Sequence, residues 1–367
     1  MVILKKEGFR EYYIDNLRNF TILLLFPVHT FMVWNDFGSK FYIWQGEQKG
    51  LSSFIVLVNP WFMPMLFVLA GISARHALGE RTAKEFMAQR ARKLLLPFVG
   101  GMAFLVPVQS FYARRFFEGY SGGYLAHLKF FFTHVTDFTG YDGAFTPGHL
   151  WFILYLFVVS MAALALSQFL PYGKAEKYVE RMPAVGILLL FVPIWLFYYL
   201  GNVGGFSLGK CFALYLAGYY VLGNGIALGR LERNIWWMAA LCVAGSVASV
   251  ELYYHCSYYG DFWVNFLGWL TVLVLLALGR KFLDKRMWVT EYLNQASYPV
   301  YLLHQTILVA VAYYTVQGAE GVAWQAFAVC SGSFVLTVAA YHVVQLMPGV
   351  RALVGRKGKP HIKGDRR

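Results

Sequence analysis

Apolar residues occur along this chain in ten long runs that are separated by short polar segments. A helix needs about 20 apolar residues to cross the roughly 30 Å hydrocarbon core of a bilayer. Within a few residues at either end, the runs lie at 18–35, 54–74, 94–112, 149–170, 183–201, 206–228, 235–256, 260–279, 297–315 and 322–346. The pattern predicts an all-α fold, a polytopic integral membrane helix bundle with about ten transmembrane helices.

The basic residues between these runs predict how the chain is oriented. If the N-terminus is cytoplasmic, the inner segments hold 26 of the 32 Lys and Arg residues. The outer segments then hold only five, which are Lys40, Lys49, Arg114, Arg115 and Lys129. Because loops rich in Lys and Arg stay in the cytoplasm, this asymmetry predicts that both termini are cytoplasmic. We expect a multi-pass protein of the cell (inner or plasma) membrane, with one membrane domain over residues 1–350 and a basic cytoplasmic tail at 351–367.

Composition agrees with a membrane protein and changes how the net charge is interpreted. Hydrophobic residues make up 58% of the chain and charged residues 14%, whereas soluble domains average about 25% charged residues. A net charge of +13 is typical of nucleic-acid binding, but the basic residues here lie in short loops, so lipids are the expected partner and nucleic acid is not. The four cysteines, Cys211, Cys242, Cys256 and Cys330, show no metal-type spacing; they are predicted to be small core residues, and no metal site is expected.

The longest connection, about residues 113–147, is predicted to lie outside and is rich in Phe and Tyr. Loops of this length are usually functional or contain structure of their own. One interpretation is an amphipathic segment in the membrane interface. The other is an aromatic platform for a sugar acceptor, and both can hold together.

Histidines in the apolar runs are candidate catalytic groups, because titratable side chains are costly in a bilayer. His29 lies eleven residues after Arg18, roughly 16 Å further along the first helix. Near neutral pH a histidine can take a proton from a hydroxyl group and return it. His149 begins the fourth run near the outer face, and His304 lies about seven residues into the ninth. For all three, a structural hydrogen bond to a neighbouring helix is the alternative.

Two further charged groups lie deep in apolar runs at similar depths. Lys210 lies in the sixth run and Glu251 in the seventh, each a few residues inward from the outer end. An ion pair between adjacent helices is the economical interpretation, and contact with an acceptor is the alternative.

The second inner segment carries closely spaced basic residues before a proline. Arg90 and Lys93 are three residues apart and share a face of a helix, whereas Arg92 points elsewhere. Basic groups at a cytoplasmic helix start suit a phosphate-bearing ligand such as coenzyme A. Ordinary loop charge that contacts lipid phosphates is the alternative.

Five motifs in order resemble the membrane acyltransferase-3 family, most closely its glucan-modifying (succinyl or acetyl) members. The first is Arg10 to Arg18, followed by ten residues and His29, and the second is Trp61 to Gly71, with Ala70-Gly71 where the family often has Ser-Gly. The third is Arg90-Ala91-Arg92-Lys93 before Pro97, where Lys93 replaces the usual arginine and loses bidentate geometry. His149-Leu150-Trp151-Phe152 and Tyr298 to His304 resemble the fourth and fifth motifs.

The resemblance implies an enzyme that transfers acyl groups other than aminoacyl groups. The implied reaction moves an acyl group, acetyl or succinyl, from cytoplasmic acyl-CoA to a hydroxyl group of an extracytoplasmic carbohydrate such as a glucan, with no tightly bound cofactor. His29 is the implied catalytic residue, acting as a base or through an acyl-histidine. Arg18, Arg90 and Lys93 are the candidates for donor binding. The acceptor-side or supporting candidates are Asp15, His149, Trp151, Tyr301 and His304.

Two other classes of function remain open from the residues alone. One is a transporter or flippase of a carbohydrate- or lipid-linked substrate, for which inverted repeats would be a sign, and none is evident. The other is a ligand-binding sensor without chemistry. Acyl-CoA hydrolysis or transfer by the purified protein distinguishes an enzyme from both.

Overall fold

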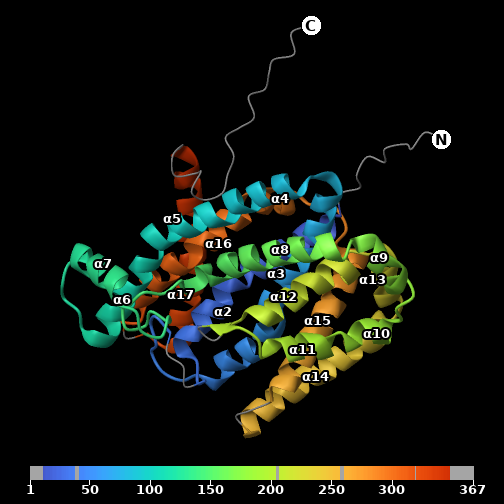
Figure 1. Ribbon diagram of the computed structural model, residues 1–367. Helices are drawn as coiled ribbons and strands as arrows, with labels where there is room; N and C mark the ends of the chain where they lie inside the picture. Colours follow the sequence, from blue (N-terminus) through green and yellow to red (C-terminus); the bar gives the residue numbers. More distant parts are fainter. Residues whose placement is uncertain (1–10, 38–40, 204–205, 257–259, 319, 348–367) are drawn as a thin grey trace.

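A computed structural model describes residues 11–37, 41–203, 206–256, 260–318 and 320–347, and the predicted tail at 351–367 lies outside these residues. Within them the chain is an all-α helix bundle, as predicted, with one short antiparallel pair of strands, β1 (Asn202–Val203) and β2 (Phe206–Ser207) (Figure 1). The helices are α1 (Tyr12–Leu23), α2 (Leu25–Phe31), η1 (Met32–Trp34), α3 (Lys49–Glu80), α4 (Ala83–Arg90), η2 (Ala91–Leu95), α5 (Leu96–Phe104), α6 (Val106–Glu118), α7 (Tyr124–Thr133), η3 (Gly148–Leu150), α8 (Trp151–Phe169), α9 (Tyr172–Val179), α10 (Ala184–Leu189), α11 (Phe191–Tyr198), α12 (Leu208–Leu216), η4 (Ala217–Leu222), α13 (Gly225–Arg233), α14 (Ile235–Cys256), α15 (Asp261–Phe282), α16 (Trp288–Thr315) and α17 (Val322–Leu346).

Each of the ten apolar runs coincides with a helix or with a set of consecutive helices. In the described part of the chain, seven helical segments are long and apolar enough to cross a membrane, or eight if the segment 208–233, bent by 92°, counts as one span. The helical segment Ala184–Tyr198 is apolar but shorter, and α16 has 28 residues but carries many polar side chains. The polytopic bundle is confirmed, and the number ten stays a prediction.

Contacts between helix ends show that the bundle has two distinct faces. On one face, the backbone N–H of Tyr13 donates to Asp284 Oδ1 over 3.2 Å, and Tyr292 Oη lies 3.0 Å from His342 Nε2. The start of α1 and the end of α17 therefore lie on the same face, which we call the inner face. On the opposite, outer face, Lys49 Nζ at the start of α3 donates to the carbonyl of Tyr254 at the end of α14 over 2.8 Å. The assignment of the inner face to the cytoplasm rests on the loop charges.

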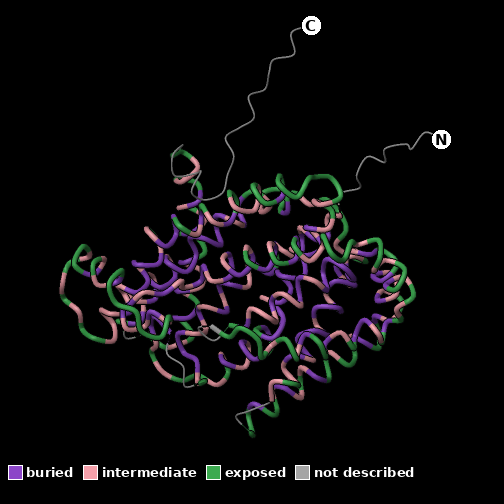
Figure 2. Tube along the Cα trace, viewed as in Figure 1, coloured by how far each residue is buried: buried purple, intermediate pink, exposed green. Residues whose placement is uncertain are grey.

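Peripheral helices expose apolar side chains, whereas α3 and α15 form the interior (Figure 2). On α14, Trp236, Val243 and Val247 are largely exposed, and on α17 Phe327 and Val335 are exposed as well. A bilayer accepts such a surface because lipid replaces water around it. The exposed apolar helices agree with a protein surrounded by lipid.

The centre of the bundle depends on a close crossing of α3 with α12 and η4. A Cβ atom on Gly71 would overlap the carbonyl oxygen of Tyr215, and one on Gly218 would overlap that of Val68. Small residues let helix backbones approach this closely in membrane bundles. Gly71, which ends the second sequence motif, is therefore fixed by packing between helices.

We expect Gly71→Ala to lower the thermal stability of the detergent-solubilised protein, because the new methyl group forces the two backbones apart. Overpacking of this kind costs about 1–3 kcal/mol. Gly79→Ala is the matched control on the same helix, since a Cβ there meets no atom within 4 Å, and alanine stabilises a helix by about 0.5–1 kcal/mol over glycine. Thermal unfolding followed by tryptophan fluorescence compares the two, and equal midpoints would contradict the packing argument.

The outer connection between α6 and α8 folds into a compact aromatic corner, which lies at the left of Figure 1. The guanidinium of Arg114 lies 4.2 Å from the ring of Tyr120 and 3.9 Å from that of Phe130. His127 is fully buried beside them, and its Nε2 lies 3.1 Å from the carbonyl of Pro107 and 3.0 Å from Ser110 Oγ. Much of the aromatic content thus packs internally, although Leu125 and Phe132 on α7 stay exposed.

His127 gives this corner an expected dependence on pH. Burial is the largest of the effects that together lower the pKa of His127 from 6.5 to about 4. Arg114 also lowers it, whereas the hydrogen bond to the carbonyl of Pro107 and the charge of Glu118 act in the opposite direction. Below pH 6.5 the unfolded chain binds a proton that the folded corner rejects, so stability falls as the pH drops from about 6.5 towards about 4 and is constant above that range. We expect the thermal midpoint of His127→Gln to depend less on pH across this window than that of the parent. Parallel curves would show that His127 is not the titrating group.

The predicted ion pair between Lys210 and Glu251 is wrong. The side chain of Glu251 is 67% exposed and lies 3.5 Å from His255, one turn along the same helix. The ammonium of Lys210 instead lies 5.7 Å from the centre of the Tyr198 ring. Apolar patterning gave similar depths for the two residues, but depth does not fix the direction in which a helix presents a side chain.

The cysteine prediction holds for buried Cys211 but is wrong for Cys256, which is exposed at the end of α14.

Candidate active site

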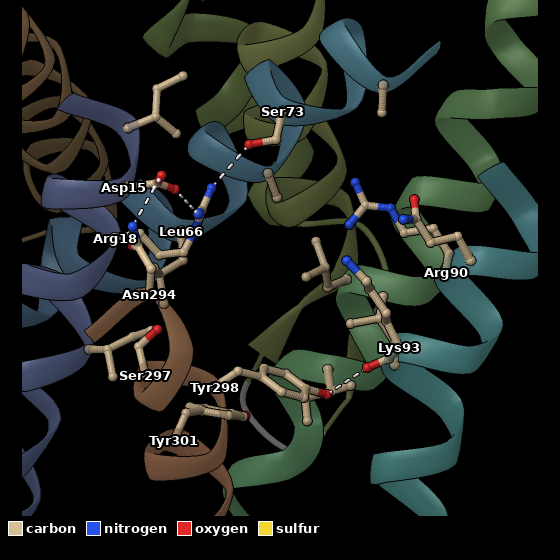
Figure 3. A pocket seen from close by; sticks show the side chains of 18 of the residues that line it. Asp15, Arg18, Leu66, Ser73, Arg90, Lys93, Asn294, Ser297, Tyr298 and Tyr301 are labelled. Atoms are coloured by element: carbon tan, nitrogen blue, oxygen red, sulfur yellow. Dashed lines mark hydrogen bonds and ion pairs between the residues drawn. The ribbon is translucent and has the colours of Figure 1, made fainter. Parts of the chain in front are cut away.

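A cavity of about 820 Å³ opens at the inner face of the bundle, between α1, α3, α4, α8 and α16 (Figure 3). One face of α1 supplies Asp15, Arg18 and Ile22, which follow one another at spacings of three and four residues. His29 lies seven residues beyond Ile22, about two helical turns outward on the same face of the continuous span Tyr12–Trp34. A ligand that follows this face from the cavity therefore approaches His29.

Polar side chains from three helices hold Arg18 at the cavity wall. Its guanidinium donates to Asp15 Oδ1 over 2.8 Å and to Ser73 Oγ over 3.1 Å. Asn294 of α16 donates to the other oxygen of Asp15 over 3.4 Å and accepts from Asn19 over 2.9 Å. The arginine is therefore fixed by several partners before any ligand binds.

The opposite wall carries Arg90 and Lys93, which point into the cavity from the end of α4 and from η2 (Figure 3). The helix winds as a π-helix over Ala91–Leu95 before Pro97, which has no N–H to continue the regular pattern. A capping box between Thr82 and Glu85 begins α4. Both basic residues line the cavity, whereas Arg92 does not.

Two tyrosines of α16 close the cavity on the side that leads toward the histidines. Tyr298 Oη donates to the carbonyl of Lys93 over 2.8 Å, which ties α16 to η2. Tyr301 Oη donates to the carbonyl of His149 over 2.5 Å, and its ring centre lies 5.9 Å from that of His304. Tyr301 therefore separates the cavity from the group of histidines beyond it.

His29, His149 and His304 come from three different parts of the chain and lie together. The ring centre of His304 is 5.3 Å from that of His29 and 5.3 Å from that of His149. His304 and His149 are buried, whereas His29 is half-buried and its ring stacks on Phe41. Of the three, His29 is thus the most accessible. The described residues contain no group of three or more His, Cys, Asp or Glu side chains placed to hold a metal ion.

Hydrogen bonds assign different roles to the three imidazoles. His149 Nε2 donates to the carbonyl of Leu302 over 3.0 Å, and its Nδ1 accepts from Gln109 over 3.1 Å. Both nitrogens of His149 are used, which is the structural role that the sequence left open. His304 Nδ1 donates to the carbonyl of Tyr301 over 2.6 Å. Among the described residues, His304 Nε2 and His29 Nδ1 have no hydrogen-bond partner.

The chemistry of the cavity changes from its inner to its outer end. The wide inner part has the cationic side chains of Arg18, Arg81, Arg90 and Lys93, which outnumber the carboxylates of Glu11 and Asp15 there. The part toward Tyr301 is formed by Ile22, Leu66, Phe152 and Ile153. Such a cavity suits a ligand with an anionic head and an apolar arm that points to the histidines. His29 lies beyond that apolar end, where it can exchange a proton with a reacting group.

The sequence candidates divide between two places in the structure. Asp15, Arg18, Arg90, Lys93 and Tyr301 line the cavity, and His29, His149 and His304 form the group beyond it. Trp151 does not line this cavity but a second one, on the outer side. The sequence analysis did not select Ser73, Asn294 and Tyr298. A signal for two of them existed, because Asn294, Tyr298 and Tyr301 recur at helical spacing of four and three residues and so share one face of the predicted helix.

Comparisons with known proteins bear on this site directly. A family model described as an acyltransferase domain, that of the acyltransferase-3 family, matches residues 11–342. The match covers the cavity and all three histidines. Neither the curated proteins nor the solved structures contain a match to the chain.

Proposed function

This chain belongs to the acyltransferase-3 family and is a membrane acyltransferase, and we propose that it transfers an acetyl or succinyl group from cytoplasmic acyl-CoA to a hydroxyl group of an extracytoplasmic carbohydrate such as a glucan. The observation that supports this proposal most is the inner cavity, with four cationic side chains at its wide end and an apolar end toward the histidines. Coenzyme A has the matching form, a phosphorylated head and a long arm that ends in the thioester.

In the proposed reaction, the phosphates of coenzyme A bind Arg18, Arg90 and Lys93, and the arm passes Ile22 and Tyr301 toward His29. His29 takes the proton of the acceptor hydroxyl, whose oxygen attacks the thioester carbonyl carbon. The carbon–sulfur bond then breaks, and the thiolate of coenzyme A takes the proton from the imidazole. In the alternative route, an imidazole nitrogen of His29 attacks the thioester carbonyl carbon, the carbon–sulfur bond breaks and the thiolate of coenzyme A leaves. The acceptor hydroxyl then attacks the acyl-imidazole, which releases His29, and the proton of the hydroxyl goes to the thiolate.

The other histidines support this chemistry by position. His304 Nδ1 is engaged with a backbone carbonyl, and its ring lies next to that of His29. Through Gln109 and Thr306, His149 ties η3 to α6 and α16. We therefore propose positioning roles for His149 and His304 and the catalytic role for His29 alone.

Acyl transfer by the purified protein tests the proposal. The protein in detergent is mixed with acetyl-CoA or succinyl-CoA and a glucose oligosaccharide, and release of free thiol is followed together with the mass of the oligosaccharide. We expect one of the two donors to give thiol release and an acylated oligosaccharide. Binding without chemistry would favour a transporter or a sensor. Mass spectrometry of surface glycans from cells with and without the protein identifies the natural acyl group and acceptor.

A further inference from the structure

A second cavity, of about 370 Å³, lies at the outer ends of α3, α8 and α12. Its lining is mostly aromatic and aliphatic, but it also carries Asn59 and Lys210. Pockets of this kind, apolar with a few polar groups, are typical of sites for organic ligands. The mechanism of acyl transfer in the inner cavity does not use either polar residue.

Lys210 faces this outer cavity, where the carboxylate of Asp261 at the start of α15 is close enough to interact with it electrostatically, but no carboxylate among the described residues forms a salt bridge with it. The side chain of Ser207 accepts from the backbone N–H of Lys210 over 3.1 Å and so begins α12 at a fixed point. Lys210 Nζ lies 5.7 Å from the ring centre of Tyr198, and in the described part of the chain it forms no salt bridge with a carboxylate. A lysine inside a membrane bundle is costly unless it is paired. An anionic group of a ligand would provide that pair.

Asn59 is a second polar group that lines this cavity. Its side chain is exposed on α3, within a helix that is otherwise apolar over this stretch, and it lines the same cavity as Lys210. Within the described residues its amide forms no hydrogen bond. An amide offers both donors and an acceptor, which suits the hydroxyl and carboxylate groups of a sugar.

The aromatic part of the cavity forms a flat surface. The rings of Trp151 and Phe206 stack with centres 3.8 Å apart and planes 12° apart, and Tyr155 Oη fixes β2 by donating to the carbonyl of Phe206 over 3.2 Å. Phe37 and Phe206 are each 40% exposed. The apolar C–H face of a sugar ring packs well on an exposed aromatic ring, whereas the headgroup of phosphatidylglycerol has no ring.

The outer cavity also shares a wall with the inner one. Leu66 and Phe152 line the inner cavity, while their chain neighbours Phe67 and Trp151 line the outer one. The ring centres of Phe67 and Phe152 are 5.0 Å apart, and that of Tyr301 is 5.8 Å from Phe152. A sugar bound outside is therefore one layer of side chains away from the inner cavity.

We infer that the outer cavity is a binding site for an acidic sugar of the acceptor, one that carries a carboxylate or a phosphate. Lys210 binds the anionic group, Asn59 binds neighbouring oxygens, and the stacked rings of Trp151 and Phe206 hold the apolar face of the sugar. The inference rests on the proposed function, because it takes the ligand to be the carbohydrate acceptor. It adds that the acceptor is acidic and that a residue distant from the histidines selects it.

Binding of two matched probes in the absence of donor tests the inference. Purified protein in a neutral detergent is titrated with a tetrasaccharide of glucuronic acid and with a tetrasaccharide of glucose, and binding is followed by tryptophan fluorescence. We expect the parent to bind the acidic probe at least about tenfold more tightly, since one charged hydrogen bond contributes about 1.5–3 kcal/mol. Lys210→Met should abolish this preference, and Lys210→Arg should retain most of it.

Lys49→Met is the matched control, because Lys49 is an outer lysine that contacts Tyr254 and does not line the cavity. Its preference should equal that of the parent. Equal affinities for the two probes in the parent, or an unchanged preference in Lys210→Met, would overturn the inference. If Lys210→Met unfolds, the parent and Lys210→Arg still test the inference, because both should bind the acidic tetrasaccharide more tightly than the neutral one.

Two further measurements distinguish the outcomes. The first measures binding of phosphatidylglycerol in nanodiscs, which contacts Lys210 if the outer cavity binds an anionic lipid. If the parent binds this lipid, Lys210→Met does not, and the acidic tetrasaccharide does not bind, the ligand of the site is a lipid and the sugar inference is overturned. Binding of coenzyme A and hydrolysis of acetyl-CoA are measured on the same preparations. If the parent neither binds coenzyme A nor hydrolyses acetyl-CoA, the proposed function is refuted. If the parent does both but binds the two tetrasaccharides equally well, only the outer site is refuted.

Discussion

His29→Ala is expected to abolish acyl transfer while the protein still inserts and folds. His29 is the most accessible of the three grouped imidazoles and lies on the helix face that leads outward from the cavity. General base catalysis contributes about 10²–10⁴-fold to a rate, and loss of an acyl-histidine route would cost at least as much. The rate of thiol release from acyl-CoA with acceptor present is the measurement.

A histidine outside the site provides the control for this variant. His342 lies near the inner end of α17, where its Nε2 is 3.0 Å from Tyr292 Oη, far along the chain from the histidine group. His342→Ala should keep most of the transfer rate. Retention of more than a few per cent of the activity by His29→Ala, with normal folding, would remove His29 from the mechanism.

Arg90→Ala and Lys93→Ala are each expected to weaken binding of acyl-CoA much more than binding of the acceptor. Both side chains point into the inner cavity from one wall (Figure 3). Removal of one charged phosphate contact costs about 1.5–3 kcal/mol, which is roughly ten- to a hundredfold in affinity. Calorimetric titration with coenzyme A measures the change, and the loss should be smaller for a pantetheine thioester, which lacks the nucleotide phosphates.

Arg92→Ala is the matched control for the basic pair. Arg92 lies between the two residues in sequence, on the same π-helical turn as Lys93, but it does not line the cavity. Its affinity for coenzyme A should equal that of the parent, which distinguishes a specific contact from general attraction to a basic surface. An unchanged affinity in both Arg90→Ala and Lys93→Ala would refute the donor site.

The fold was largely predictable, because the length of each apolar run, which predicts a membrane-spanning helix, depends on local sequence alone. Each of the ten apolar runs coincides with helix, and α15, which begins at Asp261 directly after Gly260, starts within one residue of the eighth run. Features that depend on contacts between helices were not predictable. The 92° bend after Leu222 and the π-helix at Ala91–Leu95 change the path of the chain without a clear change in its apolar pattern.

The site was predictable where residues share a helix and less so where helices meet. Spacing alone placed Arg18 and His29 on one helix, roughly 16 Å apart along its axis, and Arg90 with Lys93 on one face of another. The approach of His304 to within 5.3 Å of His29, between ring centres, joins residues 275 positions apart. No local sequence pattern predicts that contact. The same limit explains why Lys210 was assigned to Glu251, whereas the structure has it facing the outer cavity.

Transfer across a sealed membrane tests the central claim most directly. The protein is reconstituted into liposomes, with acetyl-CoA and succinyl-CoA in turn on the side of the inner face and an oligosaccharide only on the opposite side. The account predicts that acylated oligosaccharide appears on the outer side for one donor and that His29→Ala liposomes form none. The claim would be contradicted if acylated oligosaccharide formed only when donor and acceptor were on the same side of the membrane, or if neither donor gave acylated oligosaccharide.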